Sequence, residues 1–103
     1  MNDPILSVER LEELVELANK AESGFERAAV YAAASCLELE FRRKFDITPA
    51  QINSYDLEKA VNAIWHIKAM VGYNVTNNHP KGQHESWAFG ALMTLRDNLD
   101  KAD

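Results

Sequence analysis

The segment from residue 25 to residue 45 (FERAAVYAAASCLELEFRRKF) constrains the fold most, because as a helix it is apolar on nearly every side. At about 100° per residue its apolar side chains divide into two faces. One face consists of Phe25, Ala29, Ala32, Ala33 and Cys36, and the other of Val30, Ala34, Leu37, Phe41 and Phe45. A helix that is apolar all round is normally enclosed by other structure. We therefore expect this helix either to lie at the centre of a bundle or to hold a partner.

Helical periodicity recurs in four segments, and no segment alternates as a strand does. The predicted helices span about 7–22, 25–45, 55–71 and 84–99. Ser7 is a suitable N-cap for the first helix, and Ser23-Gly24 is expected to end it. Thr48-Pro49-Ala50-Gln51 is typical of a capping box and predicts a short extra helical turn near 49–53. The sequence thus predicts an all-α fold, a small four-helix bundle in which the first two helices form an antiparallel hairpin.

Size and composition fit one globular domain over residues 1–103. The chain is 47% hydrophobic and 26% charged, and at this length about two-thirds of the unfolded surface can be buried. No run of 18 apolar residues predicts a membrane span. The start of the sequence lacks the basic and apolar regions of a secretory signal, so we expect a cytoplasmic protein. Cys36, the single cysteine, is expected to be a small buried side chain in a reducing compartment.

The negative charge is concentrated near the start of the chain and suggests a first candidate binding surface. The net charge is −5. The first predicted helix carries an acidic face that could meet a basic partner, although such a face can also be simply solvated. This candidate surface consists of Glu9, Glu12, Glu13 and Glu16. The basic cluster Arg42-Arg43-Lys44 falls in the last turn of a helix, where cations complement the helix dipole, so nucleic acid is not expected as a partner.

Aromatic residues and a long connection suggest a second candidate surface. Trp65 and Trp87 fall at the edges of the apolar arcs of the third and fourth helices, where they can fill the rim of a core or form an interface. The polar stretch from Gly72 to Gln83 is long for a helix–helix connection and is either a flexible connector or a binding loop. This aromatic strip and loop comprise Trp65, Tyr73, His79, Lys81, Trp87, Phe89 and Met93.

Two charged residues interrupt apolar faces. Lys68 falls inside the apolar face of the third helix, and Glu40 falls between the two apolar faces of the second. An unpaired buried charge is costly, so each must be paired or must reach water. We expect Lys68 to cover core surface with its stem and keep its ammonium in water; a Lys68–Glu40 ion pair is the alternative.

Motifs for catalysis and metal binding are missing from the sequence. The three histidines, His66, His79 and His84, do not stand in HExxH or in a helical ExxH pair. There is no CxxC, no glycine-rich phosphate loop and no GxSxG elbow. We therefore expect no catalytic residue, no cofactor and no metal ion, and we do not expect an enzyme.

The surplus of apolar surface favours a protein-binding function. In a four-helix bundle, each helix can bury one apolar face against the others. A second apolar face on two of the helices would remain uncovered. The leading hypothesis is a non-enzymatic module that docks on a larger protein and inhibits or neutralises it, as an immunity protein does. One alternative is a homodimeric scaffold or regulator; another is a small-ligand binder or enzyme with an interhelical pocket lined by Trp65, Lys68 and Tyr73. The predicted homodimer interface, where alanines permit close helix approach, consists of Ala29, Ala32, Ala33, Cys36 and Leu37.

Overall fold

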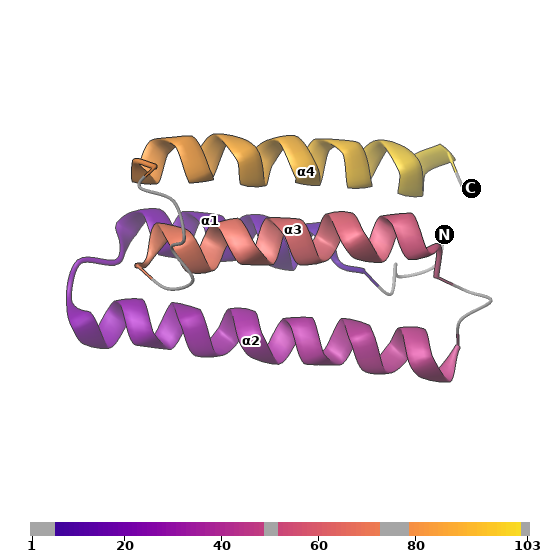
Figure 1. The fold of residues 1–103 in the computed structure, drawn as a ribbon, viewed down its shortest axis with the longest axis horizontal. Coiled ribbons are helices and arrows are strands. Elements are labelled where there is room, and N and C mark those ends of the chain that lie inside the picture. The colour runs from indigo at the N-terminus through magenta and orange to yellow at the C-terminus, as the bar shows by residue number, and fades with distance from the viewer. Residues whose placement is uncertain (1–5, 49–51, 73–78, 102–103) are drawn as a thin grey trace.

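The computed structural model is an all-α bundle of four helices, which confirms the predicted fold class (Figure 1). It describes residues 6–48, 52–72 and 79–101, and no strand occurs within these ranges. The helices are α1 (Val8–Lys20), α2 (Gly24–Ile47), α3 (Ser54–Met70) and α4 (Lys81–Lys101). Successive helices run in opposite directions, so α1 and α2 form the predicted antiparallel hairpin.

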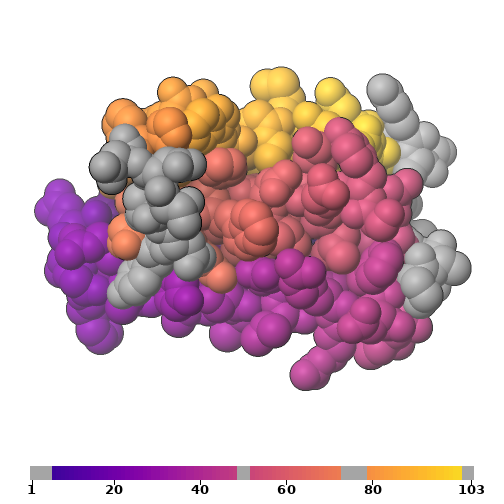
Figure 2. All heavy atoms as spheres, viewed as in Figure 1, coloured from indigo at the N-terminus to yellow at the C-terminus, as the bar shows by residue number. Residues whose placement is uncertain are grey.

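The position of α2 differs from the central one that its composition allowed. α3 packs against all three other helices, whereas α2 and α4 barely touch each other. In Figure 1, α2 and α4 lie on opposite sides of a pair formed by α1 and α3. The space-filling view shows α3 occupying the area between α4 and α2 (Figure 2). Because α2 packs almost entirely on α1 and α3, one of its sides is turned away from the bundle.

Side chains at the helix termini explain where the first two helices begin. Ser7 is the N-cap of α1, as predicted, and its hydroxyl accepts a hydrogen bond from the Arg10 amide at 3.4 Å. Ser23 does not end α1 but starts α2. Its hydroxyl accepts from the Glu26 amide at 3.0 Å, and the Glu26 carboxylate accepts from the Ser23 amide at 3.0 Å. This reciprocal capping box satisfies two amides that have no partner within the helix.

The connections that follow α2 and α3 also differ from the prediction. Thr48 caps the C-terminus of α2, where its hydroxyl donates to the Lys44 carbonyl at 2.8 Å. Pro49–Gln51 of the predicted extra turn lie outside the described residues, and Asn53 is the N-cap of α3. α4 begins at Lys81, before the predicted start at 84.

One hydrophobic core runs between the four helices. Its largest fully buried side chains are Phe41, Leu11, Ile64, Ile67, Leu92, Leu95 and Val15. α3 contributes eight buried side chains, but α2, the longest helix, contributes only Val30, Ala34, Leu37 and Phe41. Their spacing makes a single stripe, so only one of the two predicted apolar faces of α2 is buried. None of the helices in the described ranges is both long enough and apolar enough to cross a membrane.

Lys68 is buried and paired, contrary to the expectation that its ammonium reaches water. Its side chain is 9% exposed, and Nζ donates to Glu38 Oε1 at 3.1 Å. The expected alternative partner, Glu40, instead accepts from Arg10 of α1 at 2.9 Å and lies 3.9 Å from Lys44. Glu38 stands at the margin of the buried stripe of α2, where the antiparallel α3 brings Lys68 beside it. A buried ion pair therefore fixes how α2 sits on α3.

Candidate protein-binding surface

The side of α2 that faces away from the bundle carries the most exposed large apolar side chains of the described helices. Phe25 is 85% exposed, Ile47 in the last turn is 70% exposed, and Leu39 is 67% exposed. Between them along the helix lie small side chains that are also exposed. We call this surface the outward face of α2 and define it as Phe25, Ala29, Ala32, Cys36, Leu39 and Arg43.

The predicted dimer interface is mostly on this surface. Ala29, Ala32, Ala33 and Cys36 are exposed. Leu37 was placed with them, but it is 3% exposed and belongs to the core, so it is not part of the surface. The prediction that Cys36 is buried was also wrong, because the thiol lies on the side of α2 opposite the stripe that packs on α1 and α3.

The outward face has the spacing of a coiled-coil seam. Its residues recur in steps of four, three, four, three and four from Phe25 to Arg43. This alternation is the a/d pattern with which one helix packs along another. Leu39 was missed in the sequence, although its three-residue step from Cys36 continues the alternation. The pattern indicates that a helix is the kind of structure this face can hold.

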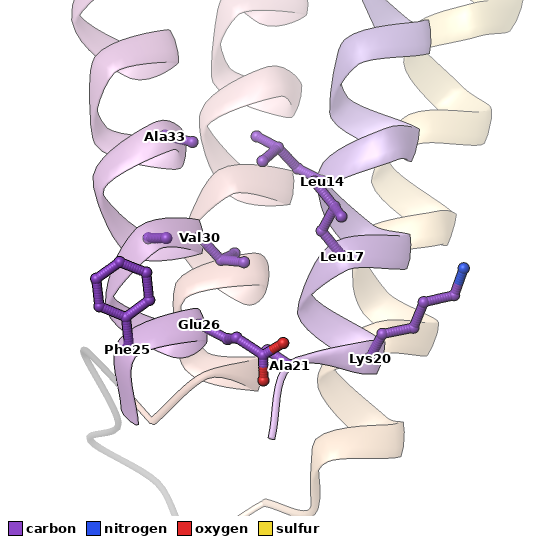
Figure 3. Close-up of a pocket in the computed structure, with 9 residues that line it drawn as sticks. Leu14, Leu17, Lys20, Ala21, Phe25, Glu26, Val30 and Ala33 are labelled. Atoms are coloured by element: carbon purple, nitrogen blue, oxygen red, sulfur yellow. The ribbon is translucent and has the colours of Figure 1, made fainter. Parts of the chain in front are cut away.

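A groove between α1 and α2 adjoins the outward face (Figure 3). Leu14 and Leu17 project from α1 towards α2, and Val30 and Ala33 project back from α2. The groove has a volume of about 270 Å³, and Leu17 in its wall is 48% exposed. A second hollow of about 220 Å³ shares Leu14, Leu17 and Ala33 and therefore extends the same groove.

Charged side chains stand at the margins of these hollows. Lys20 and Glu26 border the first, and Arg10 and Glu13 border the second. The Lys20 side chain extends away from the groove (Figure 3). The interior is thus lined by apolar groups, which suit the apolar side chains of another polypeptide better than a polar substrate.

The predicted acidic surface is partly occupied within the molecule. Glu12 accepts a hydrogen bond from Arg96 of α4 at 2.7 Å, and Glu9 lies 3.9 Å from the same guanidinium. The hydrogen bond to Glu12 raises the pKa of Arg96 above its ordinary value. Glu13 and Glu16 are exposed. A basic partner of this face would compete with Arg96 for two of its four carboxylates.

The predicted aromatic strip is not one continuous surface. Trp65 lines a hollow between α2 and α3, whereas Trp87 packs against histidines at the start of α4. Phe89 follows Trp87 by two residues, which on a helix turns it about 200° away, and Met93 shares the side of Phe89. Lys81 donates to the Asn19 carbonyl at 2.8 Å.

Of the predicted interhelical pocket, the structure describes two of the three lining residues and does not bring them together. The Trp65 hollow is lined by Arg42, Leu57 and Val61 among others, and Lys68 is not one of them. Tyr73 of the strip and of the pocket lies outside the described residues.

The three histidines form a cluster with Trp87 that the sequence did not predict. His66 of α3 and His84 of α4 place their Nδ1 atoms 3.2 Å apart. The His79 ring lies 5.8 Å from the His84 ring and 4.8 Å from the Trp87 ring. Within the described ranges, no three His, Cys, Asp or Glu side chains are arranged to hold a metal ion.

Burial affects the protonation of the histidine pair. His84 is 8% exposed, and its Nε2 atom has no hydrogen-bond partner among the residues that the structure describes. The two Nδ1 atoms share one hydrogen bond, and which ring donates it depends on the tautomer of each ring. Burial, together with a neighbouring histidine in each case, lowers the pKa of both His66 and His84. The pair is therefore neutral at pH 7.

Acidification is expected to destabilise the bundle through this pair. Above the ordinary histidine pKa of about 6.5, both the folded and the unfolded chain hold these groups neutral. As the pH falls below that value, the unfolded chain binds protons that the folded pair resists, so the free energy of unfolding decreases until the lowered native pKa values are passed. Urea unfolding at pH 7, 6 and 5 measures this, and the loss should shrink in His84→Leu. Equal stability across this range would contradict the lowered pKa values of the histidine pair.

Two carboxylates contribute at more acidic pH. The pKa values of Glu26 and Glu40 are also lowered, so their contribution to stability is lost as the pH falls below about 4.5.

Comparisons with protein-family models, with curated proteins and with solved structures found no match for this chain. The functional proposal therefore rests on the geometry of the described residues.

Proposed function

We propose that this protein is a non-enzymatic binding module that contacts another polypeptide through the outward face of α2 and the adjoining groove. The observation that supports it is the exposure of Phe25 and Leu39, at 85% and 67%, on a helix whose opposite side holds the core. Large apolar side chains gathered on one exposed face mark association surfaces in soluble proteins.

The form of this surface favours a helical partner. A helix docks by placing apolar side chains at intervals of three and four residues into a groove. Leu14, Leu17 and Ala33 form apolar walls of the groove between α1 and α2. The residues of the outward face recur at the same intervals of three and four. In this proposal the module acts by occupying its partner's surface, as an inhibitor does. The second candidate role, a homodimeric scaffold, is favoured by the a/d spacing of the outward face.

The exposed thiol favours a reducing compartment. Cys36 lies on the surface, with no second cysteine in the chain to pair with. Cysteines stay reduced in the cytosol, whereas an exposed free thiol outside the cell tends to oxidise. The proposal therefore places the protein in the cytoplasm.

Leu39→Glu is expected to abolish partner binding, because it replaces an exposed apolar side chain of the outward face with a charge. Met93→Glu is the matched control, since Met93 of α4 is 66% exposed against 67% for Leu39. Substitutions at such exposed positions change stability by no more than about 0.5 kcal/mol, so both variants should fold. The bait is incubated in an extract of the cells in which the protein naturally occurs. Wild type and Met93→Glu should then retain the same bound protein. The proposal is wrong if Leu39→Glu retains it equally well.

A further inference from the structure

We infer that the partner of the outward face of α2 is a second copy of this chain, bound as an antiparallel α2–α2 pair about a two-fold axis. The inference rests on the proposed function, in which this face is a contact surface, and names its occupant. A two-fold pair uses the same surface on both copies, so that surface must be complementary to itself. The sizes and charges of the exposed residues meet this requirement in one register.

The register follows from the a/d pattern. Phe25, Ala32 and Leu39 form one set of positions, and Ala29, Cys36 and Arg43 form the other. In an antiparallel pair, the side chains of one set lie opposite the other set of the second copy. With the axis near residue 34, Leu39 lies opposite Ala29, Ala32 opposite Cys36, and Phe25 opposite Arg43. This register pairs each of the six residues of the outward face with another of them.

Size complementarity supports this arrangement over a parallel one. Leu39 meets a small side chain, and the Ala32–Cys36 layers at the centre let the two helices approach closely. The exposed ring of Phe25 meets the stem and guanidinium of Arg43, which can stack on an aromatic face. A parallel pair in register would instead put Arg43 against Arg43 and Leu39 against Leu39.

Charge complementarity supports the same register. Glu26 flanks the seam, and the register brings it near Glu40 of the second copy. Glu40 is not a free carboxylate, because Arg10 Nη1 lies 2.9 Å from it and Lys44 Nζ lies 3.9 Å from it. Glu26 of one copy thus meets a group of three side chains whose net charge is positive.

The size of the face sets the expected affinity. A helix of 24 residues is about 36 Å long and about 10–12 Å wide, which gives about 400 Å² in projection. Stable protein interfaces bury about 800 Å² on each partner, so α2 alone supplies a small interface. Leu17, half-exposed beside Phe25 and Ala29 in the groove, can widen it. We therefore expect a dimer that dissociates in the micromolar range of concentration.

Disulfide crosslinking tests the inference and its register. In the antiparallel register the two Cys36 residues are offset by four residues, about 6 Å along the axis in addition to the helix separation, which exceeds the reach of a disulfide. Ala32→Cys places the introduced thiol of each copy opposite Cys36 of the other copy. The two-fold axis therefore creates two equivalent pairs of thiols. Under mild oxidation at high micromolar concentration, Ala32→Cys should form a covalent dimer. Wild type should not, nor should Ala32→Cys combined with Cys36→Ser. Adding Leu39→Glu to Ala32→Cys should lower the yield of dimer at least tenfold.

Three outcomes would overturn the inference. Efficient crosslinking of wild type through Cys36 would show a parallel pair. Equal crosslinking of Ala32→Cys with and without Leu39→Glu would show random collision. If no variant crosslinks and the protein stays monomeric at millimolar concentration by light scattering, a second copy is not the partner. In that last case, the proposed function still stands if wild type captures a different protein and Leu39→Glu does not. If Leu39→Glu captures that protein equally well, the proposed function is wrong as well.

Discussion

Phe41→Ala is expected to destabilise the bundle by about 3–5 kcal/mol, whereas Phe25→Ala on the same helix should change its stability by less than about 0.5 kcal/mol. The Phe41 side chain is fully buried in the core, and Phe25 is 85% exposed on the outward face. Deleting a buried ring costs both its transfer free energy and the cavity that it leaves. Deleting an exposed ring costs neither.

Urea unfolding followed by circular dichroism measures this difference, at a protein concentration low enough to keep the chain monomeric. A domain of this size has about 5–15 kcal/mol of stability in total, so Phe41→Ala can unfold a large share of the molecules. Phe41→Leu keeps most of the buried volume and provides a measurable intermediate value. Comparable losses from Phe25→Ala and Phe41→Ala would show that both sides of α2 are enclosed, and would remove the basis of the proposed function.

Glu38→Ala is expected to lower the free energy of unfolding by about 3 kcal/mol. Its removal leaves the Lys68 ammonium buried, at 9% side-chain exposure, without the carboxylate 3.1 Å away. Glu40→Ala is the matched control two residues along the same helix. Its ion pair with Arg10 has side chains 55% and 36% exposed, and exposed pairs contribute about 1 kcal/mol at most.

The reverse substitution separates loss of the pair from loss of packing. Lys68→Met keeps an unbranched apolar stem in the core, and Glu38 retains Arg42 at 3.1 Å. Lys68→Met should therefore destabilise the fold less than Glu38→Ala does. Unfolding free energies for the three variants, measured together in urea, give the order directly. Equal costs for Glu38→Ala and Glu40→Ala would contradict the account of Lys68 as a buried, paired cation.

The sequence was sufficient to predict four helices, because their apolar periodicity and caps are local signals. Ser7 is the N-cap that was predicted, and the bounds of α1 and α3 lie within two residues of expectation. Ser23 was misassigned because a serine followed by glycine can end one helix or start the next. Glu26, three residues later, completes the capping box and was the signal that favoured a start.

Which face of α2 is buried could not be predicted from its own residues. Both faces are apolar, and burial depends on where the other helices lie. Cys36 was expected to be buried because alanines surround it in the sequence. Most of those alanines, however, lie on the exposed side of α2. α3 takes the central position instead, with eight buried side chains.

Contacts between distant residues were also beyond local reasoning. His66 and His84 meet because α3 and α4 run antiparallel after the chain turns back, and Lys68 meets Glu38 thirty positions earlier in the chain. Lys68 stood out within the apolar face of its own helix, but nothing on that helix identified its partner. Their pairing depends on the relative shift and rotation of two helices, which periodicity within one helix does not determine.

The reactivity of the Cys36 thiol tests most directly whether the outward face of α2 is a contact surface covered by a second copy. The thiol is exposed in the monomer and central in the predicted pair. Its labelling rate with a small disulfide reagent should be fast in dilute solution and should fall as rising protein concentration converts monomer to dimer. Leu39→Glu should keep the fast rate at every concentration, while Met93→Glu should follow wild type. A wild-type rate constant that does not change from low micromolar to millimolar protein would contradict the account.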